Sequence, residues 1–332
     1  MNAKDKLKIL HVLSQRPDST GSGIYVQAMM REAAAGGDEN FLVAGICSAG
    51  CRDMEHIEPD RCLFIAFNKA GLSYCIPGMS DVMPYESSRF CDLSEEDINE
   101  YEVCFSKSLQ IAVDRFKPDI IHSHHLWIVS SITRRLFPDI PVVTSCHGSD
   151  LRQFQNCAHL QERVLKGCRN IDTIIALSEA QKNEIVQLYK IAPERVMIAG
   201  AGYNDRLFYP EEKPPPNPVQ IVYAGKLSNA KGSLVIAGIK VHGFFTVAIA
   251  SYRKRHRRRK RTLSRACSGV GRKCADLRST SPAGPGRNNE ALPYSGSPVF
   301  FRRLTPGYIG RACKRMPDCR NFQPTGLTSL HA

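Results

Sequence analysis

The chain has 332 residues, of which 42% are hydrophobic, and this size and composition suit a globular protein of two domains. Its formal net charge is +13, from 45 Lys and Arg against 32 Asp and Glu. Residues 241–332 contain 19 of the basic and 3 of the acidic residues, so the whole positive excess lies there. This asymmetry indicates two regions of different character rather than one nucleic-acid-binding domain.

The 13 cysteines show no metal-binding pattern. Cys47 and Cys51 lie close together, but no C-x-x-C pair occurs, and we expect no zinc site from them. The apolar run Ile9–Leu13 is too short for the core of a signal peptide, and no apolar stretch reaches membrane-spanning length. We therefore expect a cytoplasmic protein with reduced, buried thiols.

Short apolar runs alternate with amphipathic segments along the first two thirds of the chain. Within 24–35, for example, Val26, Met29 and Ala33 form one apolar stripe, and Ser178 with Gln181 forms a capping box before the last helix. The pattern predicts an α/β domain with a Rossmann-like parallel sheet, covered by helices on both faces. We expect strands at 7–13, 41–46, 62–67, 118–122, 141–145, 173–177 and 195–198, and helices at 24–35, 96–116, 127–136 and 178–189.

A proline-rich segment, 211–218, predicts a domain boundary, and a new strand follows at 219–224. Residues 253–261 are almost wholly basic, and the segment beyond them has no apolar periodicity. We expect a first domain at 1–217, the first strand and loop of a second domain at 218–232, and a basic, disordered tail at 233–332.

A glycine-rich segment, Thr20-Gly21-Ser22-Gly23, joins the first strand to the first helix. Glycines there allow a ligand to approach the backbone, and a helix N-terminus offers N–H groups to an anion. An ordinary strand–helix turn explains the segment equally well, because the spacing is not that of a dinucleotide-binding fingerprint.

Histidines follow two neighbouring strands. His147 lies in the segment 144–150, directly after a strand, where α/β proteins bind ligands, although a hydrogen-bonded loop histidine is the simpler interpretation. His122, His124 and His125 follow the preceding strand. We expect no metal shared between them, since adjacent histidines at a strand end point in opposite directions.

Two lysines follow the strand at 219–224. Lys226 comes directly after Gly225, and Lys231 precedes Gly232, a spacing that can neutralise a diphosphate. The segment lacks the glycine spacing and the hydroxyl residue of a P-loop. The alternative is a pair of solvated lysines without a ligand.

In this order, the segments resemble those of the retaining GT-B glycosyltransferases of family 4. That family has a glycine-rich loop after its first strand, a P-D-[IV]-[IV]-H element, a T-x-H-G element, an [AV]-L-S-E helix start, a glycine-rich segment ending in F-x-P, and a G-[RK]-L-x-x-x-K-G element. The corresponding segments here are 20–25, 118–122, 144–150, 176–179, 200–210 and 225–232. In the fifth, the family's aspartate is replaced by Asn204 or displaced to Asp205.

The resemblance implies transfer of a sugar from a nucleotide-sugar to a saccharide or lipid-linked acceptor, without a metal or other cofactor. It places Gly21, Ser22 and Gly23 beside the donor diphosphate and the acceptor, and His147 at the transferred sugar. Lys226 and Lys231 would hold the diphosphate in place of a metal, and His124, His125 and Asp150 would lie on the acceptor side. The protein would be cytoplasmic, with peripheral association at the inner face of the membrane as a further expectation.

The same family requires two glutamates, eight positions apart, in its second domain. After residue 212 this chain has only Glu290. Codons can be chosen for residues 298–319 so that the same nucleotides, read one base later, encode a peptide with two glutamates at that separation. In the same shifted frame, residues 233–239 and the run that begins at Tyr252 can encode segments like those of the family. We therefore interpret the tail as a frame-shifted second domain, with the break near 231–233, and expect this chain to be inactive.

Two other interpretations remain open. The basic run 253–261 would bind nucleic acid or an anionic membrane weakly, although no recognition fold accompanies it and we do not expect nucleic acid as an evolved partner. Alternatively, the chain is the acceptor-binding subunit of a split glycosyltransferase.

Overall fold

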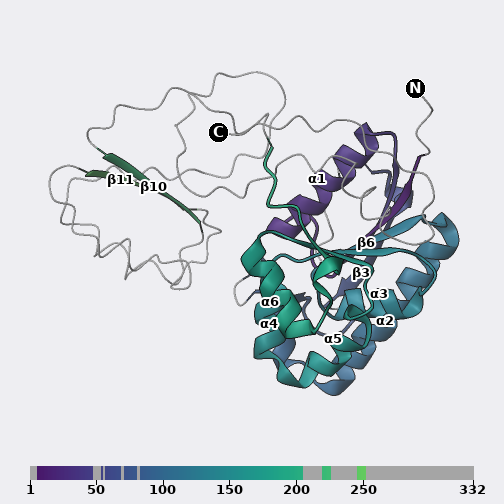
Figure 1. The fold of residues 1–332 in the computed structure, drawn as a ribbon. Helices are drawn as coiled ribbons and strands as arrows, with labels where there is room; N and C mark the ends of the chain where they lie inside the picture. Colours follow the sequence, from purple (N-terminus) through teal and green to yellow (C-terminus); the bar gives the residue numbers. More distant parts are fainter. Residues whose placement is uncertain are drawn as a thin grey trace. The chain divides into compact units, whose positions relative to one another are not determined.

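The computed structural model describes residues 6–47, 54, 57–68, 71–80, 83–204, 219–225 and 245–251 (Figure 1). These residues belong to two units, with the division after Gly202. The first unit contains the sites predicted before residue 200, and the second contains two strands.

The first unit is built on a seven-stranded sheet with the order β3-β2-β1-β6-β7-β8-β9, in which every neighbouring pair is parallel. The chain runs outward from β1 to β3 and then returns to place β6 on the other side of β1. The strand order therefore reverses between β1 and β6. The strands are β1 (Lys8–Leu13), β2 (Glu39–Cys47), β3 (Cys62–Phe67), β6 (Ile120–His124), β7 (Val142–Ser145), β8 (Thr173–Ala176) and β9 (Val196–Ile198).

Helices cover both faces of this sheet. They are α1 (Gly21–Ala35), α2 (Glu95–Phe116), α3 (Ile128–Leu136), α4 (Ser149–Asn156), α5 (Gln161–Cys168) and α6 (Glu179–Tyr189). Short 3₁₀ turns lie at Pro59–Arg61, Phe90–Asp92, Ala158–Leu160 and Pro193–Arg195, and β4 (Pro77–Gly78) pairs with β5 (Ser88–Arg89) as a separate two-stranded ladder.

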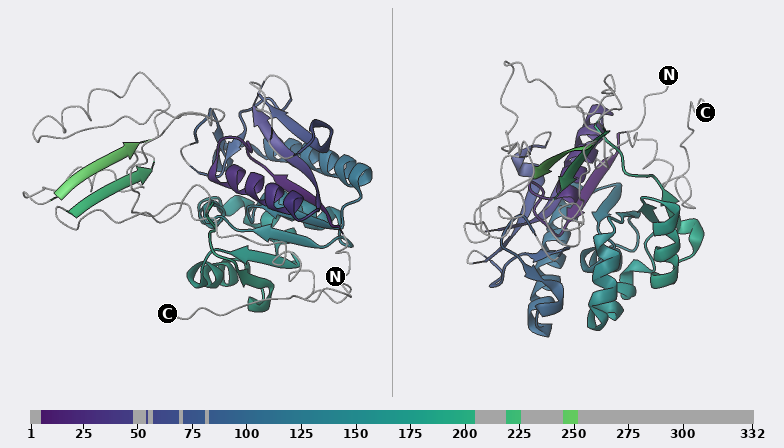
Figure 2. Two further views of the ribbon diagram at one scale, coloured as in Figure 1. Left: turned by 90° about the horizontal axis from the view of Figure 1, so that it is seen from above. Right: turned by 90° about the vertical axis from the view of Figure 1, so that its left-hand side faces the viewer.

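The helices are divided unequally between the two faces (Figure 2). On one face, Tyr25 and Met29 of α1 pack with Ile9, Ile120 and Val143 from the sheet. On the other face, the larger core joins strand residues to side chains from all five later helices. Because both faces are covered, the central strands are buried along nearly their whole length, including the polar residues His11, His122 and His124.

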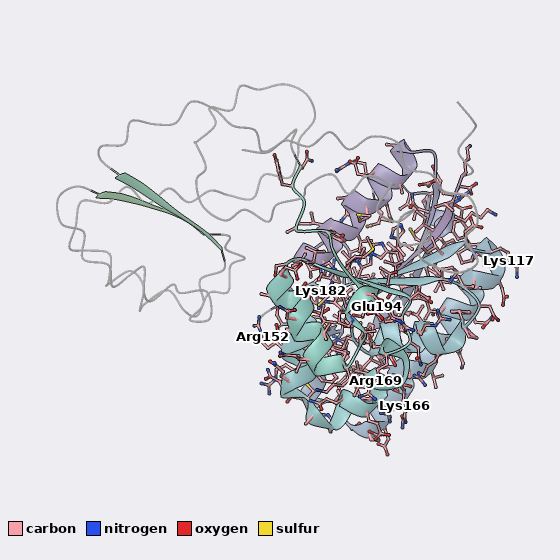
Figure 3. The ribbon with its side chains drawn as sticks, viewed as in Figure 1. Lys117, Arg152, Lys166, Arg169, Lys182 and Glu194 are labelled. Carbon is pink, nitrogen blue, oxygen red and sulfur yellow. The ribbon has the colours of Figure 1, made fainter. Side chains whose placement is uncertain are left out.

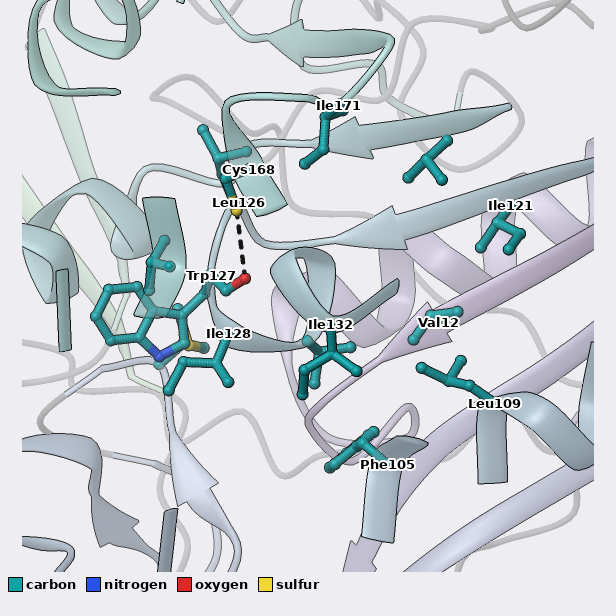
Figure 4. Packing of buried hydrophobic residues seen from close by; sticks show 14 of the residues in the cluster. Val12, Phe105, Leu109, Ile121, Leu126, Trp127, Ile128, Ile132, Cys168 and Ile171 are labelled. Atoms are coloured by element: carbon teal, nitrogen blue, oxygen red, sulfur yellow. Dashed lines mark hydrogen bonds between the residues drawn. The ribbon is translucent and has the colours of Figure 1, made fainter. Parts of the chain in front are cut away.

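The larger core surrounds Trp127, which is 1% exposed (Figure 4). Phe105 and Leu109 from α2 and Ile132 from α3 pack in the same cluster. The Cys168 thiol donates a hydrogen bond to the carbonyl oxygen of Trp127 over 3.5 Å, which links α5 to the segment before α3. Charged side chains such as Lys117, Arg152 and Lys166 project outward from the helices (Figure 3).

Hydroxyl residues cap three of the helices. Thr20 caps α1 by accepting a hydrogen bond from the Gly23 N–H over 2.9 Å. Ser94 and Asp97 form a reciprocal capping box at the start of α2. Ser178 caps α6, but Gln181 accepts from the Leu177 N–H and not from the Ser178 N–H, so the predicted capping box is only half formed.

The predicted strands and long helices of the first unit are confirmed, with ends that shift by a few residues at most. The glycine-rich segment is a correction, because Gly21, Ser22 and Gly23 are the first turn of α1 and not a loop before it. The Thr20 cap explains this early start. Helices α4 and α5 were not predicted, since each is only eight residues long and too short to show a clear period.

The second unit contains β10 (Val219–Gly225) and β11 (Phe245–Ser251), which pair in parallel over seven residues. Strand β10 confirms the strand predicted at 219–224. Strand β11 lies inside the segment 233–332, so the predicted disorder does not extend to Phe245–Ser251, a mostly apolar run of the kind that suits a strand. The other residues of the predicted tail and of the proline-rich segment lie outside the described part of the chain.

Eight cysteines fall within the described residues, and all eight are free thiols. Cys146, Cys157 and Cys168 are buried, Cys91 is exposed and the others are intermediate, so the expectation of buried thiols holds for three of the eight. Among the described helices, none combines the length and the apolar character needed to cross a bilayer.

Candidate functional site

The predicted site residues of the first unit gather at one edge of the sheet. The start of α1 follows β1, His124 and His125 lie at the end of β6, and His147 follows β7. In open α/β sheets, ligands bind beyond the carboxyl ends of the strands where the strand order reverses. Here that reversal lies between β1 and β6, which makes this edge the candidate site.

The first turn of α1 is held against the loop that precedes it. Gln27 donates to the Pro17 carbonyl oxygen over 2.7 Å, and Ser22 donates to Gln15 over 3.2 Å. A Cβ at Gly23 would collide with the Pro17 carbonyl, so a glycine is required there for packing. At Gly21, by contrast, no described atom lies within 4 Å of the place a Cβ would take, and the residue is exposed.

His147 lies beyond the carboxyl end of β7 and is partly exposed. Its ring contacts Tyr25 edge-on, with 5.2 Å between centroids, and His125 at 4.7 Å. Its Nε2 atom lies 3.4 Å from Nδ1 of His124. Its partial burial, and secondarily the neighbouring His125, lowers the pKa of His147 to about 3, so its ring is neutral at pH 7 and can donate or accept a hydrogen bond.

Backbone geometry determines where His147 points. Gly148 has a φ of 82°, a left-handed conformation that glycine adopts without strain, and it caps the start of α4. Asp150, in the first turn of α4, accepts a hydrogen bond from the His147 N–H over 3.2 Å. The chain thus turns sharply after β7 and holds the imidazole beyond the end of the strand.

The residues predicted on the acceptor side are buried. His124 and Asp150 are 0% exposed and His125 is 3% exposed. Asp150 also accepts a hydrogen bond from the Leu126 N–H over 2.8 Å, so its carboxylate joins the loops after β6 and β7. Burial lowers the pKa of His125 to about 3, which keeps this ring neutral.

Behind His147, the structure adds a residue that the sequence did not single out. His11, in the middle of β1, pairs directly across from His122 of β6, and both are 0% exposed. Burial lowers the pKa of His11 to about 4 and takes the pKa values of His122 and His124 well below their usual range. A polar residue within an otherwise apolar strand was the available signal for His11.

Lys226 and Lys231, predicted to hold a diphosphate, lie outside the described residues. A surface depression of about 370 Å³ lies elsewhere in the first unit and is lined by residues of α2, α3, α5 and the 3₁₀ turn before α5. Its charged groups pair with one another, as Arg135 and Arg163 do with Glu102 at 3.1 Å each. This depression therefore offers no unpaired charge from these arginines to a ligand.

Comparisons with known proteins show similarity to one family over part of the chain and to several solved structures in fold. Residues 86–206 match the model of the family described as Glycosyltransferase Family 4. No curated protein matches the chain. Among solved structures, the chain resembles sucrose-phosphate synthase from Thermosynechococcus elongatus, with 17% identity, a TM-score of 0.50, and coverage of 76% of this chain and 64% of that chain.

Two further solved structures are similar at lower scores. A glycosyltransferase from Rickettsia africae shares 15% identity over 76% of this chain and 62% of its own, with a TM-score of 0.47. An alpha,alpha-trehalose-phosphate synthase (UDP-forming) from Burkholderia vietnamiensis shares 11% identity over 75% of this chain and 65% of its own, with a TM-score of 0.44. The likeness to sucrose-phosphate synthase shows the fold, a Rossmann-like parallel sheet of GT-B type, and confirms the predicted fold class for the first unit.

Proposed function

We propose that the protein is built to transfer a sugar from a nucleotide-sugar to an acceptor. The premise is the match of residues 86–206 to glycosyltransferase family 4. The acceptor class we propose is a saccharide or a lipid-linked saccharide, and the transfer proceeds with retention and without a metal. Activity and substrates stay proposals, because the chain spans 64% of the length of the sucrose-phosphate synthase that it resembles.

The observation that carries this proposal is the position of His147 beside the start of α1, at the point where the strand order reverses. A helix N-terminus attracts the negative charge of a diphosphate. A neutral imidazole next to the helix N-terminus can hydrogen-bond a sugar hydroxyl. Because this ring carries no positive charge, it does not itself attract the diphosphate. The two features together fit a ligand with a diphosphate at one end and a sugar at the other.

We propose that Lys226 and Lys231 stabilise the negative charge that develops on the leaving nucleotide. Lys226 directly follows β10, so it would lie at the carboxyl end of the first strand of a second α/β unit. The family resemblance supports both retention and the lack of a metal requirement. The anomeric configuration of the product, measured by NMR, tests the retention.

We also propose that this chain is inactive by itself, because its one glutamate after residue 212, Glu290, cannot supply the family's glutamate pair. The purified chain, assayed with UDP-, GDP- and ADP-sugars, should show no turnover. A version in which the reading frame is restored after Lys231 should transfer or hydrolyse one of these donors. Clear turnover by the unaltered chain would contradict the proposed inactivity.

The restored protein allows the site to be tested residue by residue. His147→Ala should lower turnover by roughly 100-fold, as expected when one polar contact to the reacting group is lost. His159→Gln is the matched control, because His159 is exposed on a 3₁₀ turn away from the site. Equal activity of the two variants would show that His147 is not part of the site. A restored protein that neither binds nor turns over a nucleotide-sugar would refute the proposed function.

A further inference from the structure

Three buried histidines meet between the central strands and α1. His11 of β1 lies opposite His122 in the parallel ladder, and His124 lies two residues further along β6, on the same face. Their ring centroids are 5.6 Å apart for His11 and His122, 6.2 Å for His11 and His124, and 4.3 Å for His122 and His124. All three side chains are 0% exposed.

The nitrogen atoms of this cluster divide into two sets. One nitrogen of each ring has a partner outside the cluster: His11 Nε2 with Asn40 at 3.0 Å, His122 Nε2 with Ser145 at 2.9 Å, and His124 Nδ1 with His147 at 3.4 Å. The other nitrogens, His11 Nδ1, His122 Nδ1 and His124 Nε2, have no hydrogen-bond partner among the described residues. A buried polar atom without a partner is destabilising, so an arrangement with three of them calls for an explanation.

The arrangement matches what a metal ion requires. Ring nitrogens from the three residues lie within 4.8 Å of one another. The outer hydrogen bonds fix the orientation of each ring, as they do for histidines that bind metals. The low pKa values keep the rings neutral, which is the form of histidine that coordinates a metal.

We propose that His11, His122 and His124 bind one transition-metal ion of the class that prefers imidazole, with Zn²⁺ as the ion of choice. Three imidazoles leave a fourth tetrahedral position for water. With Zn–N distances of about 2.0–2.1 Å, tetrahedral ligand atoms are ~3.3 Å apart, so the rings close inward on binding. The ion ties β1 to β6 beneath α1 at the reversal of strand order.

The sequence predicts no metal shared between His122, His124 and His125, and only the first two of these belong to the cluster. His125 has a positive φ of 71° and follows the end of β6, which turns it away from the face that carries His122 and His124. His11, from a strand more than 100 residues earlier, supplies the third ligand. The proposed role of the ion is structural, so the ion takes no part in the proposed metal-free transfer, although His124 also lies 3.4 Å from His147.

Zinc content of the full chain tests the proposal. The protein is stripped with a chelator, incubated with ZnCl₂, desalted and analysed for zinc per chain by mass spectrometry. Because the 13 cysteines can also bind zinc, the difference between variants is the measured quantity. His11→Gln and His122→Gln should each lose about one equivalent relative to the unaltered chain, whereas His159→Gln should lose none.

Two further readouts separate a coordination site from a folding defect. Zinc should raise the Tm of the unaltered chain and of His159→Gln, but not that of His11→Gln or His122→Gln. Co²⁺ bound to the unaltered chain should show the visible absorption of a tetrahedral nitrogen site, and this absorption should be absent from whichever cluster variant keeps its circular-dichroism spectrum. Equal zinc content in all folded variants, or a folded unaltered chain that binds neither ion, would overturn the proposal.

Discussion

The carboxylate of Asp150 accepts a hydrogen bond from the backbone N–H of Leu126 over 2.8 Å, although the two residues follow different strands. The same oxygen, Oδ2, accepts from the His147 N–H. One buried side chain thus fixes the loops after β6 and β7 against each other and brings His125 and His147 into contact. Asp150, predicted as an acceptor-side residue, therefore has a structural role in joining these two loops.

Asp150→Ala should therefore destabilise the first unit by about 2–4 kcal/mol, because two buried N–H groups lose their acceptor. Asp150→Asn should cost less, since the amide oxygen can accept both bonds. Urea unfolding followed by tryptophan fluorescence measures the difference, as Trp127 is the single tryptophan and lies one residue beyond Leu126. Equal stabilities of the two variants would show that the carboxylate does not hold these loops.

Arg134 is an arginine of α3 with an 8% exposed side chain. Its guanidinium donates to Asp172 over 2.6 Å and to the carbonyl oxygens of Phe137 and Ile140 at 2.8 and 3.2 Å. Arg134→Ala should lower the free energy of unfolding by about 2–4 kcal/mol, because three acceptors lose a charged donor. Asp114→Asn, which breaks an exposed pair with Lys117, should leave the urea midpoint unchanged.

Gly21 and Gly23 provide a matched pair in one helical turn. Gly23→Ala should destabilise the protein by about 1–3 kcal/mol, because its Cβ would meet the Pro17 and Arg16 carbonyls. Gly21→Ala should be neutral or stabilising by about 0.5 kcal/mol, since the space around it is open and alanine favours the helix. Thermal unfolding of both variants measures this, and similar effects of the two changes would contradict the close contact at Gly23.

The free thiols should differ widely in reactivity. Cys91 is exposed, whereas Cys146 and Cys168 are buried and their burial raises their thiol pKa values well above the usual range. Iodoacetamide at pH 8 should label Cys91 first, and the two buried thiols roughly 100-fold more slowly, because they react only through opening of the fold. Peptide mapping by mass spectrometry identifies each site, and labelling in urea, where all should react alike, is the control.

The coding DNA around codons 228–236 tests the frame-shift interpretation directly. We expect a purine run near the codons for 231–233 with one inserted base. Its removal should give one open frame that encodes two glutamates eight positions apart in place of the present residues 298–319. A coding sequence in which no single change of frame restores such a domain would refute the interpretation.

Several features of the fold were predictable because they depend on local pattern. The run 62–67 forms β3 with the predicted bounds, and the amphipathic stripe of 96–116 forms α2 with one more residue at its start. Side-chain periodicity determines such elements without reference to the rest of the chain. The start of α1 was misplaced, since glycines suggest a loop unless the capping hydrogen bond from Gly23 to Thr20 is known.

The sequence by itself determined the class of this domain, the order of its strands and helices along the chain, and the family motifs that they carry. Tertiary structure decided which strands are neighbours. By placing β6 beside β1, it put His11 against His122 and His124 and set His147 next to the start of α1. Strand pairing joins residues that are far apart in the chain, so neither relationship has a local signal in the sequence.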